Sequence, residues 1–365
     1  MVIAVNTRSL FDIQYGENIF FYQVFKRITS LYPQHTFIFI FDRPYNNSLI
    51  FSKNTIPLVI GPKATNSLQW RIWHNIKIPG ILKKYNADLF ISPEGLTRPG
   101  KKIPQYLISC TINSSKQPIE GKPNFQKSIA ASSYKKSDRI ICTSHYLENI
   151  ITAKYKIDTE KIDVVYEVAG PDYVPALIED REKIKDEYAG GNEYFLLYPP
   201  DSGKDFLIML KAFSVFKKRQ KSTMKLLVIG HAGMDQEMNE SLRLFKYRQD
   251  IHILNDLPGA EQIKVMAAAY AFIQPANSEN YVSLLHAMHC NVPVIAGNTG
   301  ALPEIGGAAV LYINTADHTD IAEKMMLIFK DEKLRQDYIT KGNEQVQKFT
   351  LEIAASTLWE SILKR

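Results

Sequence analysis

The segment YFLLYPPDSGKDFLIMLKAFSVFKKRQKSTMKLLVI, residues 194–229, decides the fold class. A short apolar run at 194–198 is followed by an amphipathic stretch at 205–218 and by a second apolar run at 225–229. Short runs rich in aromatic and aliphatic residues are typical of buried strands, and the stretch between them has the period of a helix. The segment therefore predicts a strand–helix–strand unit, which joins two parallel strands of one sheet.

The same alternation extends through most of the chain in both directions. Toward the N-terminus we expect strands at 2–5, 36–41, 88–91, 106–111, 139–142 and 161–165, and helices at 19–31, 72–85, 128–136 and 144–154. Ser144 is the expected N-cap of the last of these helices. Toward the C-terminus we expect strands at 252–254, 271–273 and 293–296, and helices at 260–269 and 284–290. Strands that alternate with helices predict an α/β fold with doubly wound parallel sheets.

A break in this alternation predicts two domains, because 365 residues exceed what a single core usually supports. Glycine and proline at 170–175 precede a charged stretch that ends in two glycines at 190–191. We expect an N-terminal Rossmann-like domain at 1–170, a C-terminal Rossmann-like domain at 171–349, and a C-terminal helix at 350–365 that either domain could receive. Ligands of doubly wound sheets bind beyond the carboxyl ends of the strands, so the expected site is the cleft between the domains.

The composition excludes several classes of protein. Hydrophobic residues make up 45% of the chain and charged residues 22%, which is typical of a globular protein and not of a disordered or fibrous one. The net charge of +6 is spread along the chain, and the densest basic cluster, KKRQK at 217–221, fits a solvated helix end better than a nucleic-acid site. The three cysteines lie far apart, which predicts reduced thiols and no disulfide framework.

The expected localisation is cytoplasmic, because the chain shows neither a secretory signal nor an apolar run near the ~20 residues of a spanning helix. A peripheral contact with the inner face of a membrane is an alternative that rests on the run WRIW at 70–73, followed by Lys77. The competing interpretation is ordinary packing, because Ile72, Ile76 and Leu82 recur at roughly helical spacing.

No motif for metal binding or hydrolysis stands out. His286, His289 and Cys290 have the spacing of two metal ligands on one helix face, but no fourth ligand is evident. Neither a Ser-His-Asp set nor a Walker-type phosphate loop is present. We therefore expect no metal and no cofactor.

Two neighbouring stretches resemble the donor-site region of glycosyltransferase family 4, the group 1 glycosyltransferases. These are HAMHCNVPVI at 286–295 and NTGALPE at 298–304. Shorter motifs fall in the family's order over nearly the whole chain: NTR at 6–8, ADLFISP at 87–93, SDRIICTS at 137–144 and KIDVV at 161–165. The resemblance implies the GT-B fold, in which two Rossmann-like domains face a central cleft. It also implies transfer of a sugar from a nucleotide-diphosphate donor with retention of configuration, usually without a metal.

On the phosphate side of the donor site, the resemblance places Lys204 on the family's lysine and Pro199 on its usual arginine. Tyr198 falls on a common glycine. Gly16 falls in the loop after the first strand, where the family has glycines near the phosphates, and Glu17 adds a negative charge there. Lys204 is thus the phosphate-binding and catalytic residue that the resemblance retains.

On the sugar and ribose side, the family's two glutamates fall on Ser278 and His286, and Glu279 lies one place from the first. Ser283 is the expected cap of the following helix. Thr299 and Gly300 keep the family's pattern. These six residues form the rest of the expected donor site.

Two residues of the first domain complete the expected site. Asn113 stands where the family has a His-Asp pair beside the transferred sugar, and it is the second candidate catalytic residue. Glu94 follows the strand expected at 88–91 and is the acidic candidate on the acceptor side.

The replaced donor contacts predict a glycosyltransferase-family protein of bacterial-type glycan or polysaccharide assembly whose nucleotide-sugar site is weak or inactive. Losing the ribose carboxylate and the phosphate arginine removes ~3–6 kcal/mol, or ~10²–10⁴ in donor affinity. Such a protein would serve as the partner subunit of an active glycosyltransferase. The alternative is an active retaining enzyme that transfers a sugar to a glycan or lipid-linked acceptor, and a third interpretation is a binding module for another ligand. Nucleic acid is not an expected partner.

Overall fold

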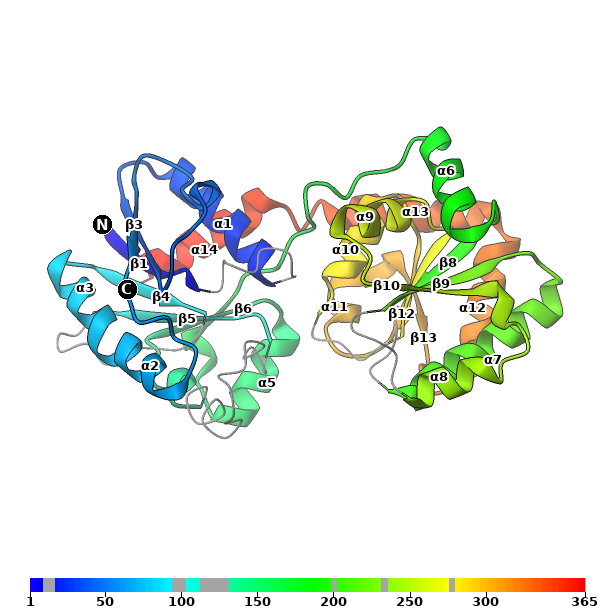
Figure 1. The fold of residues 1–365 in the computed structure, drawn as a ribbon, viewed down its shortest axis with the longest axis horizontal. Coiled ribbons are helices and arrows are strands. Elements are labelled where there is room, and N and C mark those ends of the chain that lie inside the picture. The colour runs from blue at the N-terminus through cyan, green and yellow to red at the C-terminus, as the bar shows by residue number, and fades with distance from the viewer. Residues whose placement is uncertain are drawn as a thin grey trace. The chain divides into compact units, whose positions relative to one another are not determined.

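The structure, a computed structural model, describes residues 1–8, 17–93, 103–111, 131–198, 202–230, 236–275 and 280–364. These residues form two compact units (Figure 1). The first unit consists of Met1–Val168 together with Thr350–Arg365, and the second consists of Ala169–Phe349. No helix in the described parts of the chain is long and apolar enough to cross a membrane.

The first unit is built on a parallel sheet of seven strands in the order β3-β2-β1-β4-β5-β6-β7. The strands are β1 (Val2–Asn6), β2 (Thr36–Phe41), β3 (Thr55–Val59), β4 (Leu89–Ser92), β5 (Gln105–Ser109), β6 (Arg139–Cys142) and β7 (Ile162–Val164). Most of their side chains are buried, because helices cover both faces of a parallel sheet. Only β3 was not predicted: it contains Pro57, which a strand tolerates at the edge of a sheet.

The helices of the first unit largely match the predicted ones. They are α1 (Glu17–Leu31), α2 (Ser67–Ile72), the π-helical segment η3 (Trp73–Lys77), α3 (Ile78–Lys84), a helical stretch at 131–136, α5 (His145–Tyr155) and α14 (Leu351–Leu363). Ser144 caps α5 as predicted, since its hydroxyl accepts a hydrogen bond from the Leu147 amide at 3.1 Å.

The helical segment from α2 to α3 begins five residues before the predicted start at 72. The side chain of Asn66 caps it by accepting hydrogen bonds from the amides of Leu68 and Gln69. Trp70 and Trp73 are buried, and the Trp73 indole donates to the Ile60 carbonyl at 2.7 Å. The two tryptophans of the WRIW run are therefore core residues and not interfacial anchors.

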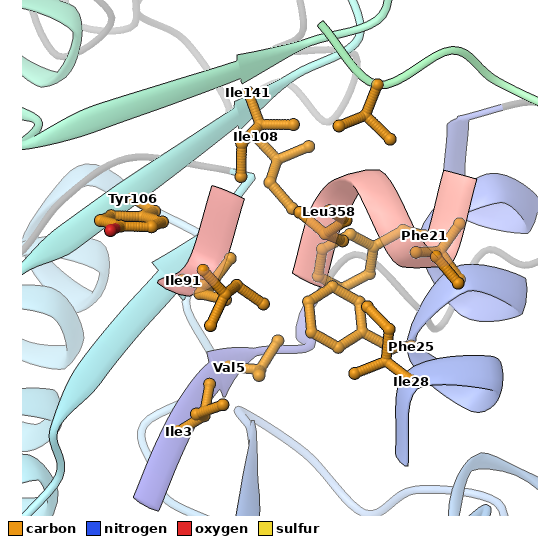
Figure 2. Close-up of a cluster of buried hydrophobic side chains, with 14 of the residues drawn as sticks. Ile3, Val5, Phe21, Phe25, Ile28, Ile91, Tyr106, Ile108, Ile141 and Leu358 are labelled. Carbon is orange, nitrogen blue, oxygen red and sulfur yellow. The ribbon is translucent and has the colours of Figure 1, made fainter. Parts of the chain in front are cut away.

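The C-terminal helix α14 packs in the first unit, which settles the question that the sequence left open. It lies beside α1, and its buried face joins the core on one side of the sheet. Figure 2 shows Leu358 of α14 near Phe21 and Phe25 of α1 and Ile108 of β5. Trp359 stacks on Tyr32 with the ring centroids 3.9 Å apart.

The second unit has a parallel sheet of six strands in the order β10-β9-β8-β11-β12-β13. The strands are β8 (Tyr194–Leu197), β9 (Lys225–Gly230), β10 (Ile251–Asn255), β11 (Ala271–Gln274), β12 (Val294–Gly297) and β13 (Val310–Ile313). The helices are α6 (Ile178–Ala189), α7 (Gly203–Gln220), α8 (Gln236–Arg243), α9 (Gly259–Ala267), α10 (Val282–His289), α11 (Leu302–Gly306), α12 (His318–Lys330) and α13 (Glu332–Val346). The segment 194–229 forms β8, α7 and β9 as predicted, with Tyr194 paired to Lys225 in parallel register.

The helices of the second unit cover both faces of its sheet (Figure 1). Helices α7 and α12 pack together over one face, where Phe206, Phe213 and Met325 join the core. Helices α9 and α10 pack together over the other. Because helices cover both faces of the sheet, the loops that can bind a ligand lie at the ends of the strands.

Candidate functional site

The carboxyl ends of β8 and β11 form the candidate site, because the strand order reverses between them. From β8 the chain first adds β9 and β10 on one side and then crosses to β11 on the other side. In doubly wound sheets such a reversal sends neighbouring loops apart and leaves a crevice at the carboxyl edge. The residues after β8 lead into α7, which carries Lys204, and those after β11 lead into α10, which carries Ser283 and His286.

The first turn of α7 combines a cation with one carboxylate, and a second carboxylate from α8 packs on it. Lys204 is exposed and forms no ion pair with any residue that the structure describes. Ser202 caps the helix: its hydroxyl accepts from the Asp205 amide at 3.2 Å and donates to the Asp205 carboxylate at 2.8 Å. A side chain on Gly203 would lie within 2.7 Å of Glu237, so α8 packs directly on this turn. The attraction of Lys204 and the helix N-terminus for an anion is therefore opposed by Asp205 and Glu237.

The start of α10 differs from the prediction that Ser283 caps it. The helix begins at Val282, and the side chain of Asn280 accepts a hydrogen bond from the Val282 amide at 3.2 Å. Ser283 is the second residue of the helix and is buried. The prediction that Ser283 caps the helix was wrong, because Ser283 lies inside the helix and Asn280, two residues before its first residue, accepts from the Val282 amide instead.

His286 lies on α10 with its ring stacked on Tyr173. The two ring centroids are 3.5 Å apart and the planes differ by 4°. Burial, with a smaller contribution from His289, lowers the pKa of His286 to about 3, and burial raises the pKa of Tyr173 to about 12. Both rings are therefore neutral at ordinary pH. The pair offers hydrogen bonds from the ring edges but no carboxylate where the resemblance expects one.

Two more groups near this pair, Tyr198 and Cys290, are also neutral, while the carboxylate of Asp172 acts on Tyr173 as a nearby negative charge. Tyr198, directly after β8, packs edge-on against Phe272 of β11 with centroids 5.1 Å apart, and burial raises the pKa of Tyr198. Burial raises the pKa of the Cys290 thiol to about 12, so the thiol stays protonated and is a poor metal ligand. Across the described ranges, no three acidic, histidine or cysteine side chains form a metal site, and the helical set His286, His289 and Cys290 does not make one.

Thr299 and Gly300 lie at the carboxyl ends of β12 and β13, in the same edge of the sheet. Thr299 lines a cavity of about 330 Å³ together with Asn298, Tyr312, Asn314 and Thr315. Gly300 has a φ of +68°, a conformation that glycine adopts without strain. The sequence analysis therefore identified one residue of this wall, Thr299, and missed those that β13 contributes, because no strand was predicted at 310–313.

Gln274 is a site residue that the sequence analysis missed. It ends β11 and is 5% exposed. Its amide nitrogen donates to the Asn280 carbonyl at 2.9 Å, while its side-chain oxygen is buried and has no hydrogen-bond partner among the described residues. A buried acceptor without a donor costs roughly 1–3 kcal/mol, which makes this oxygen a candidate contact for a ligand hydroxyl. The sequence signal that could have identified Gln274 is a polar residue directly after the apolar run that was predicted as a strand at 271–273.

The remaining predicted site residues lie outside the described residues: Gly16, Glu94, Asn113, Ser278, Glu279 and Pro199. Their assigned roles stay predictions. The structure places Lys204, Ser283, His286, Thr299 and Gly300 at one edge of one sheet, which is the part of the predicted donor site that it describes.

Replacing Gly297 by alanine is expected to destabilise the second unit and distort this edge. The added methyl group would lie 2.9 Å from Thr315 and 3.0 Å from the Pro275 carbonyl oxygen, so backbone must move. Overpacking of this kind costs roughly 1–3 kcal/mol, or a fall of about 2–10 °C in melting temperature for a unit of this size.

The control for this prediction is Gly259→Ala, because no atom lies within 4 Å of a methyl group added there. Thermal unfolding of both variants checks the prediction. Equal melting temperatures for the two variants would contradict it.

The whole chain superposes on glycosyltransferase structures. A glycosyltransferase from Rickettsia africae matches with a TM-score of 0.74 and 17% identity, covering 100% of this chain and 99% of that one. The Anabaena protein HepE, solved in complex with UDP and glucose, matches with a TM-score of 0.71 and 12% identity, covering 100% and 99%. The fold is GT-B, with two parallel-sheet Rossmann-like domains, and the predicted fold class is confirmed.

The sequence itself matches a family in the second unit. Residues 180–345 match the family model described as glycosyl transferases group 1. The O-antigen chain mannosyltransferase B of Escherichia coli is 23% identical over 217 residues, which are 58% of this chain and 57% of that protein. The chain thus spans a little over half the length of this relative. These matches support the glycosyltransferase resemblance.

Proposed function

We propose that the protein is a family 4 glycosyltransferase homologue of bacterial polysaccharide assembly with a weakened nucleotide-sugar site, which acts in the cytoplasm as the partner of an active glycosyltransferase. The observation that carries the proposal is the neutral His286, stacked on Tyr173 where the resemblance expects a carboxylate. The name of the Escherichia coli relative supports O-antigen-type assembly, and the UDP and glucose of the HepE structure support a nucleotide-sugar ligand.

The contacts that remain favour weak donor binding. Lys204 supplies a cation for the diphosphate, but Asp205 shares its helical turn and Glu237 packs on that turn. Gln274 and Thr299 supply neutral groups that can bind sugar or ribose hydroxyls. A neutral contact to a hydroxyl contributes only about 0.5–1.5 kcal/mol, so these groups do not replace a charged pair.

A second candidate function is retaining transfer from a nucleotide-diphosphate sugar to a glycan or lipid-linked acceptor. It is favoured by Lys204, by the close approach of the chain at Gly297, and by the positive φ of Gly300 in the NTG motif that the resemblance retains. In this reading Asn113 borders the transferred sugar and Glu94 faces the acceptor, as the resemblance implies.

Calorimetry of the full chain separates the two functions. We expect uridine, guanosine and adenosine diphosphates and their sugars to bind with millimolar or weaker affinity, because two charged contacts are missing and each tenfold in affinity needs ~1.4 kcal/mol. Hydrolysis of the donor sugars should be slow or absent. Micromolar binding with turnover would overturn the proposal and establish the active enzyme.

A variant with His286→Glu and Ser278→Glu tests whether donor binding at this site can be strengthened. Restoring two carboxylates for ribose and sugar hydroxyls should tighten donor binding about tenfold or more, since a hydrogen bond to a charged group contributes ~1.5–3 kcal/mol. The control is His289→Glu, which adds a carboxylate to the same helix one turn away. Equal effects of the two changes would mean that the donor does not bind beside His286.

A further inference from the structure

A basic cavity lies at the opposite edge of the second unit's sheet, where β8, β9 and β10 begin. It has a volume of about 540 Å³, and its wall includes Lys217, Lys218, Lys221, Lys225 and Asp250. Lys225 is the first residue of β9, and Asp250 directly precedes β10. Lys217, Lys218 and Lys221 come from the end of α7. The cavity therefore lies at the amino ends of strands whose carboxyl ends carry the candidate donor site.

The charges in this wall do not cancel. Asp250 pairs with two lysines, at 2.9 Å from the Lys217 ammonium and 2.7 Å from that of Lys225. Lys218 and Lys221 are exposed and form no ion pair within the ranges that the structure describes. Four lysines and one aspartate leave a net charge of +3 on the cavity wall.

The wall is held in place by buried hydrogen bonds. Lys217 is buried, and its ammonium group donates to the Ser222 and Met224 carbonyls and to the Asp250 carboxylate. These three contacts use all three N–H donors of the Lys217 ammonium group. The Ser222 hydroxyl accepts from the Met224 amide at 3.0 Å and fixes the turn between α7 and β9. A preformed wall lowers the entropy that a ligand must lose on binding.

We propose that this cavity binds a phosphate group, as a phosphate monoester or a diphosphate. The donors left over are the ammonium groups of Lys218 and Lys221, two hydrogens of Lys225, and the hydroxyls of Ser222 and Thr223. Ammonium and hydroxyl groups around a charge of +3 suit a compact dianion, and lysine binds phosphate as a point charge. The C-terminal dipole of α7 opposes an anion here, and the lysines of its last turn offset that dipole.

The phosphate could come from two sources, a soluble phosphorylated compound or the headgroup of an anionic lipid. The proposal does not depend on the proposed function, because the cavity shares none of the residues of the donor site.

Titration of the full chain with inorganic pyrophosphate, followed by amide resonances in nuclear magnetic resonance, tests the site. We expect saturable shifts at 217–225 and 247–251 that weaken as salt rises, because salt screens exposed charges over ~8–10 Å. In a variant with Lys218→Gln and Lys221→Gln these shifts should require at least about tenfold more pyrophosphate, a change of ~1.4 kcal/mol.

The matched control carries Lys211→Gln and Lys333→Gln, which removes the same charge from two exposed lysines outside the cavity. It should bind pyrophosphate at 217–225 as the unaltered protein does, and so should Lys204→Ala, which removes the cation of the donor site. Equal weakening in the matched control, or no shifts at 217–225 at tens of millimolar pyrophosphate, would overturn the proposal. Loss of binding with Lys204→Ala would assign the anion to the carboxyl edge instead.

Sedimentation with vesicles distinguishes the sources. If the phosphate is a lipid headgroup, the protein should bind vesicles that contain phosphatidylglycerol, should lose that binding with Lys218→Gln and Lys221→Gln, and should ignore pure phosphatidylcholine. If the ligand is soluble, pyrophosphate should bind at the cavity while the two lysine changes leave vesicle binding unaffected. Either result keeps the cavity as a phosphate site.

Discussion

Replacing Trp359 by alanine is expected to lower the free energy of unfolding of the first unit by roughly 3–5 kcal/mol, the usual cost of deleting a large buried aromatic side chain. Trp359 is 6% exposed, stacks on Tyr32 and contacts the ring of His35 at 4.9 Å between centroids. Its loss opens a cavity between α14 and the segment that joins α1 to β2. Hydrogen exchange of the amides in α1 measures the effect, because it reports on the first unit alone.

The control for this change is Ile353→Ala, also on α14 but 45% exposed. It should cost less than about 1 kcal/mol, since little apolar surface is removed from the core. If both variants raise the exchange rates in α1 equally, α14 does not stabilise the first unit through Trp359.

Mild acid is expected to destabilise the first unit through His74. This side chain is fully buried, and neither ring nitrogen has a hydrogen-bond partner among the residues described. Burial, and after it the charge of Arg8, lowers the pKa of His74 to about 3 from an ordinary 6.5. Between pH ~3 and ~6.5, the His74 side chain is therefore protonated in the unfolded chain and neutral in the folded chain. Stability is complete above pH ~6.5 and falls as the pH drops, by about 2 kcal/mol near pH 5.

The variant His74→Phe should remove this dependence, because phenylalanine keeps the stacking on Trp70, at 4.0 Å between centroids, and binds no proton. Urea unfolding of both proteins at about pH 7.5 and pH 5, followed by hydrogen exchange of first-unit amides, measures how much stability each protein loses in acid. Working above pH ~5 keeps the titration of carboxylates small. If His74→Phe loses as much stability in acid as the unaltered chain, His74 is not the group that titrates.

The strands were predictable where both faces of a sheet are covered, because such strands are continuous apolar runs. This holds for β2 and β8, whose residues are almost all buried. Edge strand β3 was missed because Pro57 breaks the run, and α6 was missed because a sequence such as IEDREKIKDEYA buries few residues and shows little apolar period. Helices and strands that are stabilised mainly by contacts with neighbouring elements show only a weak apolar pattern in their own sequence.

The candidate site was predictable in part. Lys204, His286, Thr299 and Gly300 were named from the resemblance, and all lie at the carboxyl edge of the second unit's sheet. The stack of Tyr173 on His286 was not predictable, because it joins residues more than a hundred positions apart. The unpartnered oxygen of Gln274 could not be predicted either, since only packing shows which polar atoms lack a partner.

The docking of α14 has a consequence for the order in which the chain folds. The chain leaves the first unit after Val168 and returns to it at Thr350, so the second unit is an insertion within the first. During synthesis, Leu358, Trp359 and Ile362 reach the first core only after the whole inserted unit has been made. The second unit can then complete its core while the first still lacks one of its helices, which reverses the usual N-terminal-first order of domain folding.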